Sequence, residues 1–328
     1  MESKTFARLG RVAAIAELFE GTGFKPFGEP LFAEVRGYAT TSTKVLLEGI
    51  DFDLVYFPLK HLGYKSVLEA TGELYAVLSK PRALSVVLGV SAKLDFEQVR
   101  EIWSGMVQAA KEHGYASMSL DLQPSKNGLC ISVSATGVEP ADMKRSKAQS
   151  KDLVCVSGSL GAAYLGQRLL EAEKANFDRG QLAQDKLEKN KMLVSAYLKP
   201  ELDTDVQSRI ISSGVTPSFG YFVNRGLSDA VLRLQRDSGM GAKVYADKIP
   251  FEGNSISVAK ELDVDPVSAA MNGGDDCRLL FVIPIMQLEA FRKEFPTFDI
   301  IGHLALPEAG ATLVTPDGLE HLISAQGW

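Results

Sequence analysis

Strand-like and helix-like segments alternate along the chain, and this alternation limits the fold more than any other feature of the sequence. Residues 83–91 (ALSVVLGVS) are rich in β-branched side chains, which favour a strand. Asp95 and Gln98 then have the spacing of a capping box, and apolar residues recur at helical intervals as far as Gly114. The second half continues this mixture without a solenoid repeat, so the sequence predicts a mixed α/β or α+β protein.

The same criteria predict the other elements. Helices are expected at residues 5–20, 64–79, 160–177, 181–198, 203–213 and 227–239. Strands are expected at residues 31–35, 44–49, 116–121, 129–137, 152–158, 242–246, 277–285, 299–304 and 311–315. Glycine and proline punctuate these segments, as they do between the elements of compact domains.

The length of the chain predicts two domains, because its 328 residues exceed the roughly 100–200 that one domain usually contains. A polar segment at residues 139–152 (EPADMKRSKAQSKD) interrupts the regular pattern. It has the composition of a linker or surface loop, and a basic phosphate-binding loop is the alternative. We place the boundary here, with an N-terminal domain at residues 1–148 and a C-terminal domain at residues 149–328.

Composition argues against several classes of protein. A net charge of −6 provides no overall basic field for nucleic acid or for an anionic membrane. Three widely spaced cysteines in apolar runs (Cys130, Cys155 and Cys277) predict buried free thiols rather than disulfides or a metal cluster. No apolar run approaches the roughly 18–20 residues of a membrane span, and the first residues lack a secretory signal. We therefore expect a cytoplasmic protein that binds neither nucleic acid nor membranes.

Common catalytic motifs are missing from the sequence. It contains no Walker A loop, no G-x-G-x-x-G at a helix start and no G-x-S-x-G elbow. Two features remain as candidate sites. One is the acid pair Asp275 and Asp276 in NGGDDCRLLF, for which solvated acids in a turn are the alternative. The other is residues 220–234 (GYFVNRGLSDAVLRL), where Gly226 separates a strand from a helix. Backbone N–H groups point outward at such a turn and can bind phosphate.

Several segments in order resemble the thiamine-monophosphate kinase family of the aminoimidazole ribonucleotide synthetase superfamily. The similar segments are LLEGIDFDLVYFPLKHLGYKSV, PRALSVVLGVS, DLVCVSGSLGAAYLG, NGGDDCRLLFVIP and LVTPDGLEHLISAQGW. The resemblance implies a two-domain aminoimidazole ribonucleotide synthetase-like fold, with an N-terminal sheet domain that forms a homodimer and a C-terminal α/β domain. It also implies transfer of phosphate from ATP to thiamine monophosphate in thiamine diphosphate biosynthesis, with aspartates that hold Mg²⁺ between the phosphates.

The acidic motifs of that family are where this chain departs from it. The gly-asp-asp motif aligns with Gly28, Glu29 and Pro30, and the thr-thr-asp motif ends at Lys44. A family histidine aligns with Asp51. The positions that keep an acid in the asn-leu-ser-asp and gly-gly-asp-thr-thr motifs are Glu73 and Asp121.

The asp-ile-ser-asp-gly-leu motif changes most. It reads Phe222, Val223, Asn224, Arg225, Gly226 and Leu227, so the turn glycine is kept and both aspartates are replaced. A cation at such a position repels Mg²⁺ and cannot coordinate it. The resemblance therefore implies a catalytically degenerate kinase homologue that acts as a dimeric binding or scaffold protein.

The ligand-binding candidates under this hypothesis are Lys44, Asp51, Asp121, Arg225, Asp275 and Asp276, and no residue is assigned a catalytic role. A metal-free site for a phosphate-containing small molecule would form if Lys44 and Arg225 converge near Gly226, unless Asp51 or Asp121 pairs with them internally. The alternative is an active, divergent kinase that uses ATP and fewer Mg²⁺ ions. In that case the metal ligands would be Glu29, Glu73 and Asp121.

Overall fold

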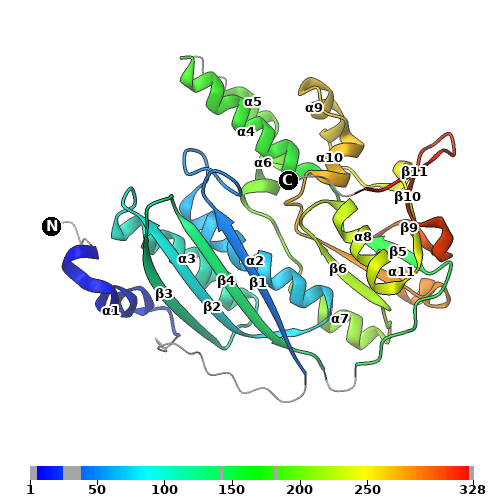
Figure 1. Cartoon of the computed structure of the whole chain (residues 1–328), viewed down its shortest axis with the longest axis horizontal. Helices are drawn as coiled ribbons and strands as arrows, with labels where there is room; N and C mark the ends of the chain where they lie inside the picture. The colour runs from blue at the N-terminus through cyan, green and yellow to red at the C-terminus, as the bar shows by residue number, and fades with distance from the viewer. Residues whose placement is uncertain (1–5, 25–37, 141–142, 181–183, 325–328) are drawn as a thin grey trace. The chain divides into compact units, whose positions relative to one another are not determined.

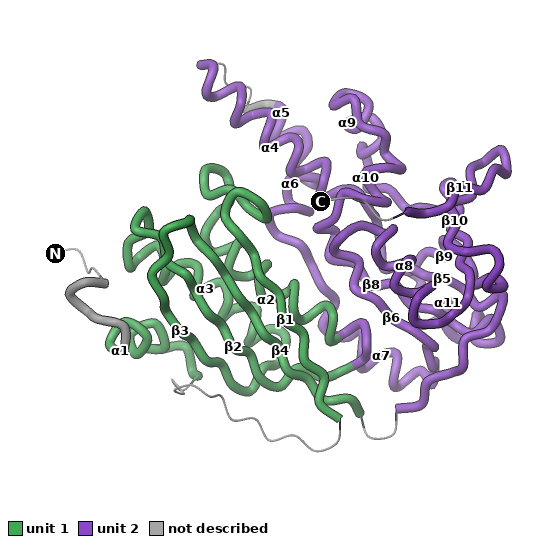
Figure 2. The backbone as a smooth tube through the Cα atoms, viewed as in Figure 1, with its two compact units in different colours: residues 1–74, 79–141 green, residues 75–78, 142–328 purple. Residues whose placement is uncertain are grey.

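The computed structural model describes residues 6–24, 38–140, 143–180 and 184–324, which form two compact units (Figure 2). The first unit comprises residues 1–74 and 79–141, and the second comprises residues 75–78 and 142–328. The short segment 75–78 thus belongs with the C-terminal half of the chain. Each unit has its own sheet and its own apolar core.

The first unit is a four-stranded sheet with helices on one face (Figure 1). The strands follow the order β1-β4-β2-β3, and only β2 and β3 are parallel. The elements are α1 (Phe6–Phe19), β1 (Ala39–Leu47), α2 (Leu59–Ala76), β2 (Lys80–Ser91), α3 (Phe96–Glu112), β3 (Ser117–Ser125) and β4 (Cys130–Val138).

Successive side chains of these strands point to opposite faces of the sheet. Helices cover one of these faces, and the other is open. Residues opposite each other in paired strands share a face of the sheet. One row across the sheet is Lys44, Val133, Val86 and Leu120, and its three apolar members are almost fully buried under α2 and α3. The next row is Val45, Ser132, Val87 and Asp121, on the opposite face. Val45 is 53% exposed and Val87 is 41% exposed, so this second face is open in the single chain.

The two helices on the covered face touch through their backbones. An added Cβ at Gly63 in α2 would lie 1.9 Å from the Ile102 carbonyl oxygen, and one at Gly105 in α3 would lie 1.9 Å from that of Lys60. Only glycine allows this approach. The capping box is confirmed: the Gln98 N–H donates to Asp95 Oδ1 over 2.8 Å, and the Asp95 N–H donates to Gln98 Oε1 over 2.9 Å.

The second unit is a seven-stranded sheet in the order β11-β10-β7-β9-β5-β8-β6. Its strands are β5 (Leu153–Val156), β6 (Phe219–Val223), β7 (Gly241–Tyr245), β8 (Arg278–Ile283), β9 (Asp299–Ala305), β10 (Ala311–Val314) and β11 (Glu320–Leu322). Its helices are α4 (Ala162–Asp178), α5 (Gln184–Lys189), α6 (Lys191–Leu198), α7 (Val206–Ser213), α8 (Leu227–Ser238), α9 (Ser255–Glu261), α10 (Pro266–Asn272) and α11 (Leu288–Glu294), with 3-10 turns η1 (Ala246–Lys248), η2 (Ile285–Gln287) and η3 (Pro307–Ala309).

Strand direction brings four loops to one edge of this sheet. β5 and β6 are both antiparallel to β8, so they run the same way. β7 is antiparallel to β9, as β5 is, and β10 is parallel to β7. The carboxyl ends of β5, β6, β7 and β10 therefore meet at the same edge, which is where open α/β sheets usually bind ligands.

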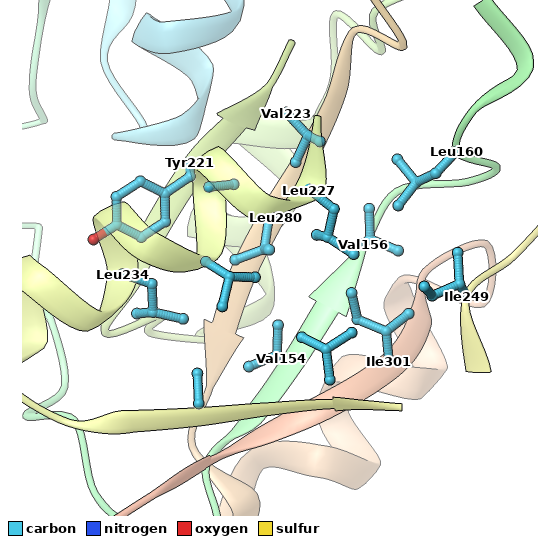
Figure 3. Close-up of a cluster of buried hydrophobic side chains, with 14 of the residues drawn as sticks. Val154, Val156, Leu160, Tyr221, Val223, Leu227, Leu234, Ile249, Leu280 and Ile301 are labelled. Carbon is cyan, nitrogen blue, oxygen red and sulfur yellow. The ribbon is translucent and has the colours of Figure 1, made fainter. Parts of the chain in front are cut away.

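The core of the second unit holds α8 against the sheet. Figure 3 shows Leu227 and Leu234 of α8 beside Val154, Val156 and Leu280 of the central strands, and all five are essentially buried. The packing of the apolar side chains of α8 against the sheet therefore fixes where the helix begins. Leu227, the first residue of α8, directly follows Gly226. Burying such a side chain contributes about 1.5–3 kcal/mol.

The mixed α/β fold expected from the sequence is confirmed, with shifts in some elements. β1 begins at Ala39 and α2 at Leu59, each five residues before the predicted start. The helix predicted at residues 181–198 contains a break at Asn190, whose side-chain amide donates to the Lys186 carbonyl and so closes α5. The strand predicted at residues 31–35 lies outside the described residues.

The sequence did not predict α9, α10, α11 and β11, which have seven residues or fewer and little periodicity. All three cysteines are free, as predicted, although Cys130 is only partly buried. Among the described residues, none of the helices combines the length and apolar character that crossing a membrane requires.

Candidate functional site

The candidate site lies at the carboxyl edge of the second sheet, where β5 and β6 lead into α4 and α8. Both helices begin at this edge, and the segment that precedes β8 returns to it. The first N–H groups of a helix have no partner within the helix, and the helix dipole is positive there. The edge is therefore suited to carboxylates or phosphates.

The turn before α8 requires glycine at position 226. Gly226 has φ 84° and ψ 161°, a combination essentially restricted to glycine. An added Cβ would lie 2.4 Å from the Met271 carbonyl oxygen. The turn brings Arg225 to the surface while Leu227 is buried. The chain thus keeps the geometry of a strand-to-helix turn and exposes a guanidinium group there.

The segment before β8 is held against this turn. The Asp275 N–H donates to the Asn224 carbonyl over 2.8 Å, and the Cys277 thiol donates to Asn224 Oδ1 over 3.3 Å. Asp275 has φ 64° and Cys277 has φ 52°, which are left-handed conformations that cost energy for residues with a side chain. Strained backbone of this kind concentrates at functional sites, and here it lies beside Arg225.

Asp276 caps α4 from a distant part of the sequence. Its Oδ2 accepts the Gly161 N–H over 2.8 Å and its Oδ1 accepts the Ala163 N–H over 3.2 Å. Gly161 has no side chain with which to cap the helix, so Asp276 supplies the acceptors. Burial raises the pKa of Asp276 to about 7, against the opposing effect of the two backbone hydrogen bonds and of Arg278. Both carboxylate oxygens therefore accept hydrogen bonds that hold the start of α4 at this edge of the sheet.

In the first unit, Lys44 forms an ion pair with Glu73 of α2, with 2.8 Å between Nζ and Oε1. The two side chains are 19% and 24% exposed. Glu73, rather than the expected Asp51 or Asp121, is thus the carboxylate that pairs with Lys44. The sheet explains this for Asp121, because Lys44 faces the helices and Asp121 lies in the next row on the open face.

The other two acids of this unit make local contacts. Asp51 Oδ2 accepts the Leu47 N–H over 2.7 Å in the turn after β1. Asp121 accepts a hydrogen bond from the side-chain amide of Gln123 over 3.1 Å. Glu29 lies outside the described residues.

The structure brings some sequence candidates together within each unit. In the second unit, the segment that contains Asp275 and Asp276 contacts the turn that contains Arg225. In the first unit, Lys44 and Glu73 form a pair. Within neither unit do the described residues include three or more His, Cys, Asp or Glu side chains grouped as a metal site. Lys44 and Arg225 belong to different units, so their convergence stays a prediction.

Sequence reasoning did not single out Asn224 as the residue that ties the two loops together. Its backbone carbonyl and its side-chain oxygen each accept one bond from the segment before β8. The only sequence signal was its position two residues before the turn glycine Gly226, where a polar residue with a short side chain can bond to nearby backbone. The long-range partner could not be read from that position.

Comparison with known proteins agrees with this fold. The family described as AIR synthase related protein, N-terminal domain, matches residues 33–138. The thiamine-monophosphate kinase of Aquifex aeolicus is 24% identical over 243 residues, which are 74% of this chain and 75% of that protein.

Two solved structures cover nearly the whole chain. AaThiL, complexed with AMPPCP and TMP, has a TM-score of 0.71 at 21% identity and covers 98% of this chain and 100% of its own. The hydrogenase maturation protein HypE of E. coli has a TM-score of 0.71 at 16% identity and covers 97% and 96%. The expected two-sheet aminoimidazole ribonucleotide synthetase-like fold is therefore confirmed. Residues 33–138 are thus similar to the AIR synthase related N-terminal domain, and the chain as a whole has the fold of the thiamine-monophosphate kinases and of HypE.

Proposed function

We propose that this protein is a homodimeric binding or scaffold protein that keeps the kinase fold without the kinase chemistry. The observation that carries the proposal is the turn after β6. Phe222 and Arg225 stand at the two positions where the family motif has aspartates, while the turn at Gly226 and the helix after it are kept. The two replacements have different structural effects, and both act against metal binding.

Phe222 occupies the first of these two motif positions and is part of the core. Its side chain is fully buried, and its carbonyl oxygen accepts a hydrogen bond from Arg233 Nη2 over 2.8 Å. A phenyl ring offers no oxygen to Mg²⁺, which prefers oxygen ligands. This substitution removes a metal ligand and adds apolar burial in its place.

Arg225 makes the second position cationic and exposed. The guanidinium has donors only, so it repels Mg²⁺ but can pair with a phosphate in a bidentate manner. The N–H groups that open α8 add further donors for an anion. AaThiL was solved with AMPPCP and TMP. We therefore propose a phosphate-containing small molecule as the ligand, bound without a metal.

The Lys44–Glu73 pair supports loss of catalysis in the first unit as well. Glu73 is one of the acids that an active enzyme would use for Mg²⁺, and here an ammonium group lies 2.8 Å from it. A metal at Glu73 would have to displace Lys44 and leave that largely buried cation without its carboxylate. Such an exchange is costly because a charge away from water needs a partner.

The open face of the first sheet supports the homodimer. Val45 and Val87 are exposed on it, among small hydroxyl side chains such as Ser132 and Ser134. A flat face of this kind could pack against the same face of a second copy, which is the self-complementary contact of a twofold dimer. Light scattering should give twice the mass of the chain, and Val45→Asp should reduce it to that of one chain. A monomeric wild-type protein at micromolar concentration would argue against the dimer.

Calorimetric titration tests the ligand proposal. ATP, ADP and thiamine monophosphate are each titrated into the protein with Mg²⁺ and with EDTA. We expect at least one of them to bind equally well in both conditions. Binding that requires Mg²⁺ would instead favour the active, divergent kinase, in which the metal ligands come from the retained acids.

A further inference from the structure

β11 leaves one edge of the second sheet open. It is the last strand in the sheet order, and among the described residues it pairs only with β10 (Figure 1). The Leu319 carbonyl, just before β11, accepts the Thr315 N–H over 2.9 Å. Just after β11, the Ile323 N–H donates to the Ala311 carbonyl over 2.8 Å. Residues 319–323 therefore form a continuous edge.

The backbone of this edge can pair with one more strand. In an antiparallel pair, the backbone groups of successive residues point alternately towards the partner strand and away from it. Leu319 and Ile323 bond to β10. Glu320 and Leu322, at the alternate positions, therefore point their N–H and C=O groups away from β10. All of β11 is exposed, so an incoming strand can reach these groups.

A cavity of about 450 Å³ lies beside this edge. Its lining includes Leu322 and Ile323 of the edge and Val267 and Met271 of α10. Its volume is within the roughly 300–1,000 Å³ of binding pockets. The side chains of an added strand point alternately to the two faces of the sheet, so every second one lies on the cavity side. The cavity can therefore hold an apolar side chain of a strand that is added to β11.

Apolar side chains are exposed along the same edge. Leu322 is 76% exposed although it lines the cavity, and Leu319 is 57% exposed. An added strand would remove part of both side chains from water, which favours binding. Exposed apolar groups, open backbone groups and a cavity thus occur together on one short segment.

The charges around the cavity favour a basic partner. Of the described residues that line it, Asp265 is the one carboxylate and none is a lysine or an arginine. Asp263, two residues earlier, and Asp317, at the tip of the hairpin, are also exposed. Glu320 is already neutralised by its ion pair with Lys243. A lysine or an arginine in the partner would therefore meet carboxylates, whereas an acidic segment would be repelled.

We propose that the β11 edge and this cavity bind an extended, basic segment of a partner protein. The segment pairs with β11 as an additional strand and inserts an apolar side chain into the cavity. The inference goes beyond the proposed phosphate binding and does not depend on it, because Arg225 does not line the cavity. It gives the proposed scaffold role a partner of defined chemistry.

Three short synthetic peptides test this proposal. In the first, lysine alternates with leucine, and in the second, glutamate replaces lysine. The third has the composition of the first, but its lysines and leucines form separate blocks and cannot occupy opposite faces of a strand. Fluorescence anisotropy of the labelled peptides follows binding to the full chain. We expect the first to bind at least about tenfold more tightly than either of the others, and equal affinities would overturn the proposal.

Two variants test the backbone pairing. Leu322→Pro removes an outward N–H and leaves the bonds to β10 in place, because that N–H does not bond to β10. Leu322→Ala is the matched control, since it removes the same side chain but keeps the N–H. Leu322→Pro should bind the alternating peptide at least about fivefold more weakly than Leu322→Ala. If both variants, shown to fold by thermal melting, bind it equally well, the segment is not added as a strand.

Two further variants test the cavity. Val267→Trp should fill it and weaken binding of the alternating peptide at least about tenfold, because the inserted side chain competes for the same volume. Ile256→Trp is the matched control, since Ile256 is 59% exposed on α9 and does not line the cavity. Unchanged affinity in folded Val267→Trp would contradict the proposal.

Light scattering distinguishes a partner protein from a second copy of this chain. Leu322→Pro should have the same mass as the wild-type protein, whether or not the proposed dimer forms through the first unit. A lower mass in this variant would show that the edge pairs with another copy, and the proposal of a partner protein would then be wrong.

Discussion

Lys44 and Arg225 are two cations that the resemblance aligns with aspartates of the thiamine-monophosphate kinase family, and their surroundings differ. Lys44 is mostly buried and pairs with Glu73 inside the first unit. Arg225 is exposed at the turn that opens α8 in the second unit. Under the proposed function, Lys44 neutralises a neighbouring acid that could otherwise hold a metal, whereas Arg225 stays at the surface for an incoming anion. The comparison shows that burial decides whether a cation is neutralised inside its own unit or stays at the surface.

The turn at Gly226 must keep its shape for this comparison to hold. Gly226→Ala should destabilise the second unit by about 3 kcal/mol or more, because a Cβ would strain the backbone and clash with Met271. Gly239→Ala is the matched control. Gly239 also has positive φ, but an added Cβ there meets nothing within 4 Å, so about 1 kcal/mol is expected. Urea unfolding measures both, and equal losses would show that the close contact contributes nothing.

The exposed cation should matter for ligand binding. Arg225→Ala should weaken binding of a phosphate-containing ligand by roughly 1.5–3 kcal/mol, the scale of a hydrogen bond to a charged group. Arg168→Ala is the control, because Arg168 is an exposed arginine of α4 that pairs with Glu171. Titration of the ligand identified for the wild-type protein measures the effect. If both variants bind with wild-type affinity, Arg225 has no role in recognition.

The buried cation should instead matter for stability. Lys44→Met should destabilise the first unit by about 1–2 kcal/mol, because it leaves the Glu73 carboxylate largely buried without its cation. Adding Glu73→Gln should recover much of the loss, since the unpaired charge is then gone. Chemical unfolding of the single and double variants provides the test. A double variant less stable than Lys44→Met would contradict an internal pairing role.

The two units should also respond to pH in opposite directions. Burial lowers the pKa of His113 in the first unit to about 4, so its stabilising contribution is present above pH 6.5 and is lost as pH falls towards 4. Burial raises the pKa of Asp276 in the second unit to about 7, so its contribution is present at low pH and is lost as pH rises from about 4 to 7. Each slope is at most about 1.4 kcal/mol per pH unit.

Hydrogen exchange can follow β4 and β5 as separate reporters of the two units. His113→Gln should remove the part of the pH dependence of stability that His113 causes in the first unit. Asp276→Asn should remove the part that Asp276 causes in the second unit. Slopes of the same sign in both units would show that these two groups do not control the response.

Local patterns were predictable from the sequence, and long-range pairings were not. The capping box at Asp95 was predicted because both partners lie within three residues of each other. Asp276 was recognised as a candidate, but its role as the cap of α4 depends on residues more than 110 positions away. The Lys44–Glu73 pair likewise depends on which face of β1 is covered by α2. Fold and candidate positions followed from pattern and resemblance, whereas the partners required the packed structure.

Kinase turnover tests the central claim most directly. Purified protein is incubated with ATP, thiamine monophosphate and Mg²⁺, and formation of thiamine diphosphate is measured beside an intact family enzyme. Loss of one preorganised group that stabilises charge can reduce a rate about 10²–10³-fold, and under the proposed function several such groups are replaced. We therefore predict a rate at least a thousandfold below that of the intact enzyme. Turnover within tenfold of that enzyme would contradict the account.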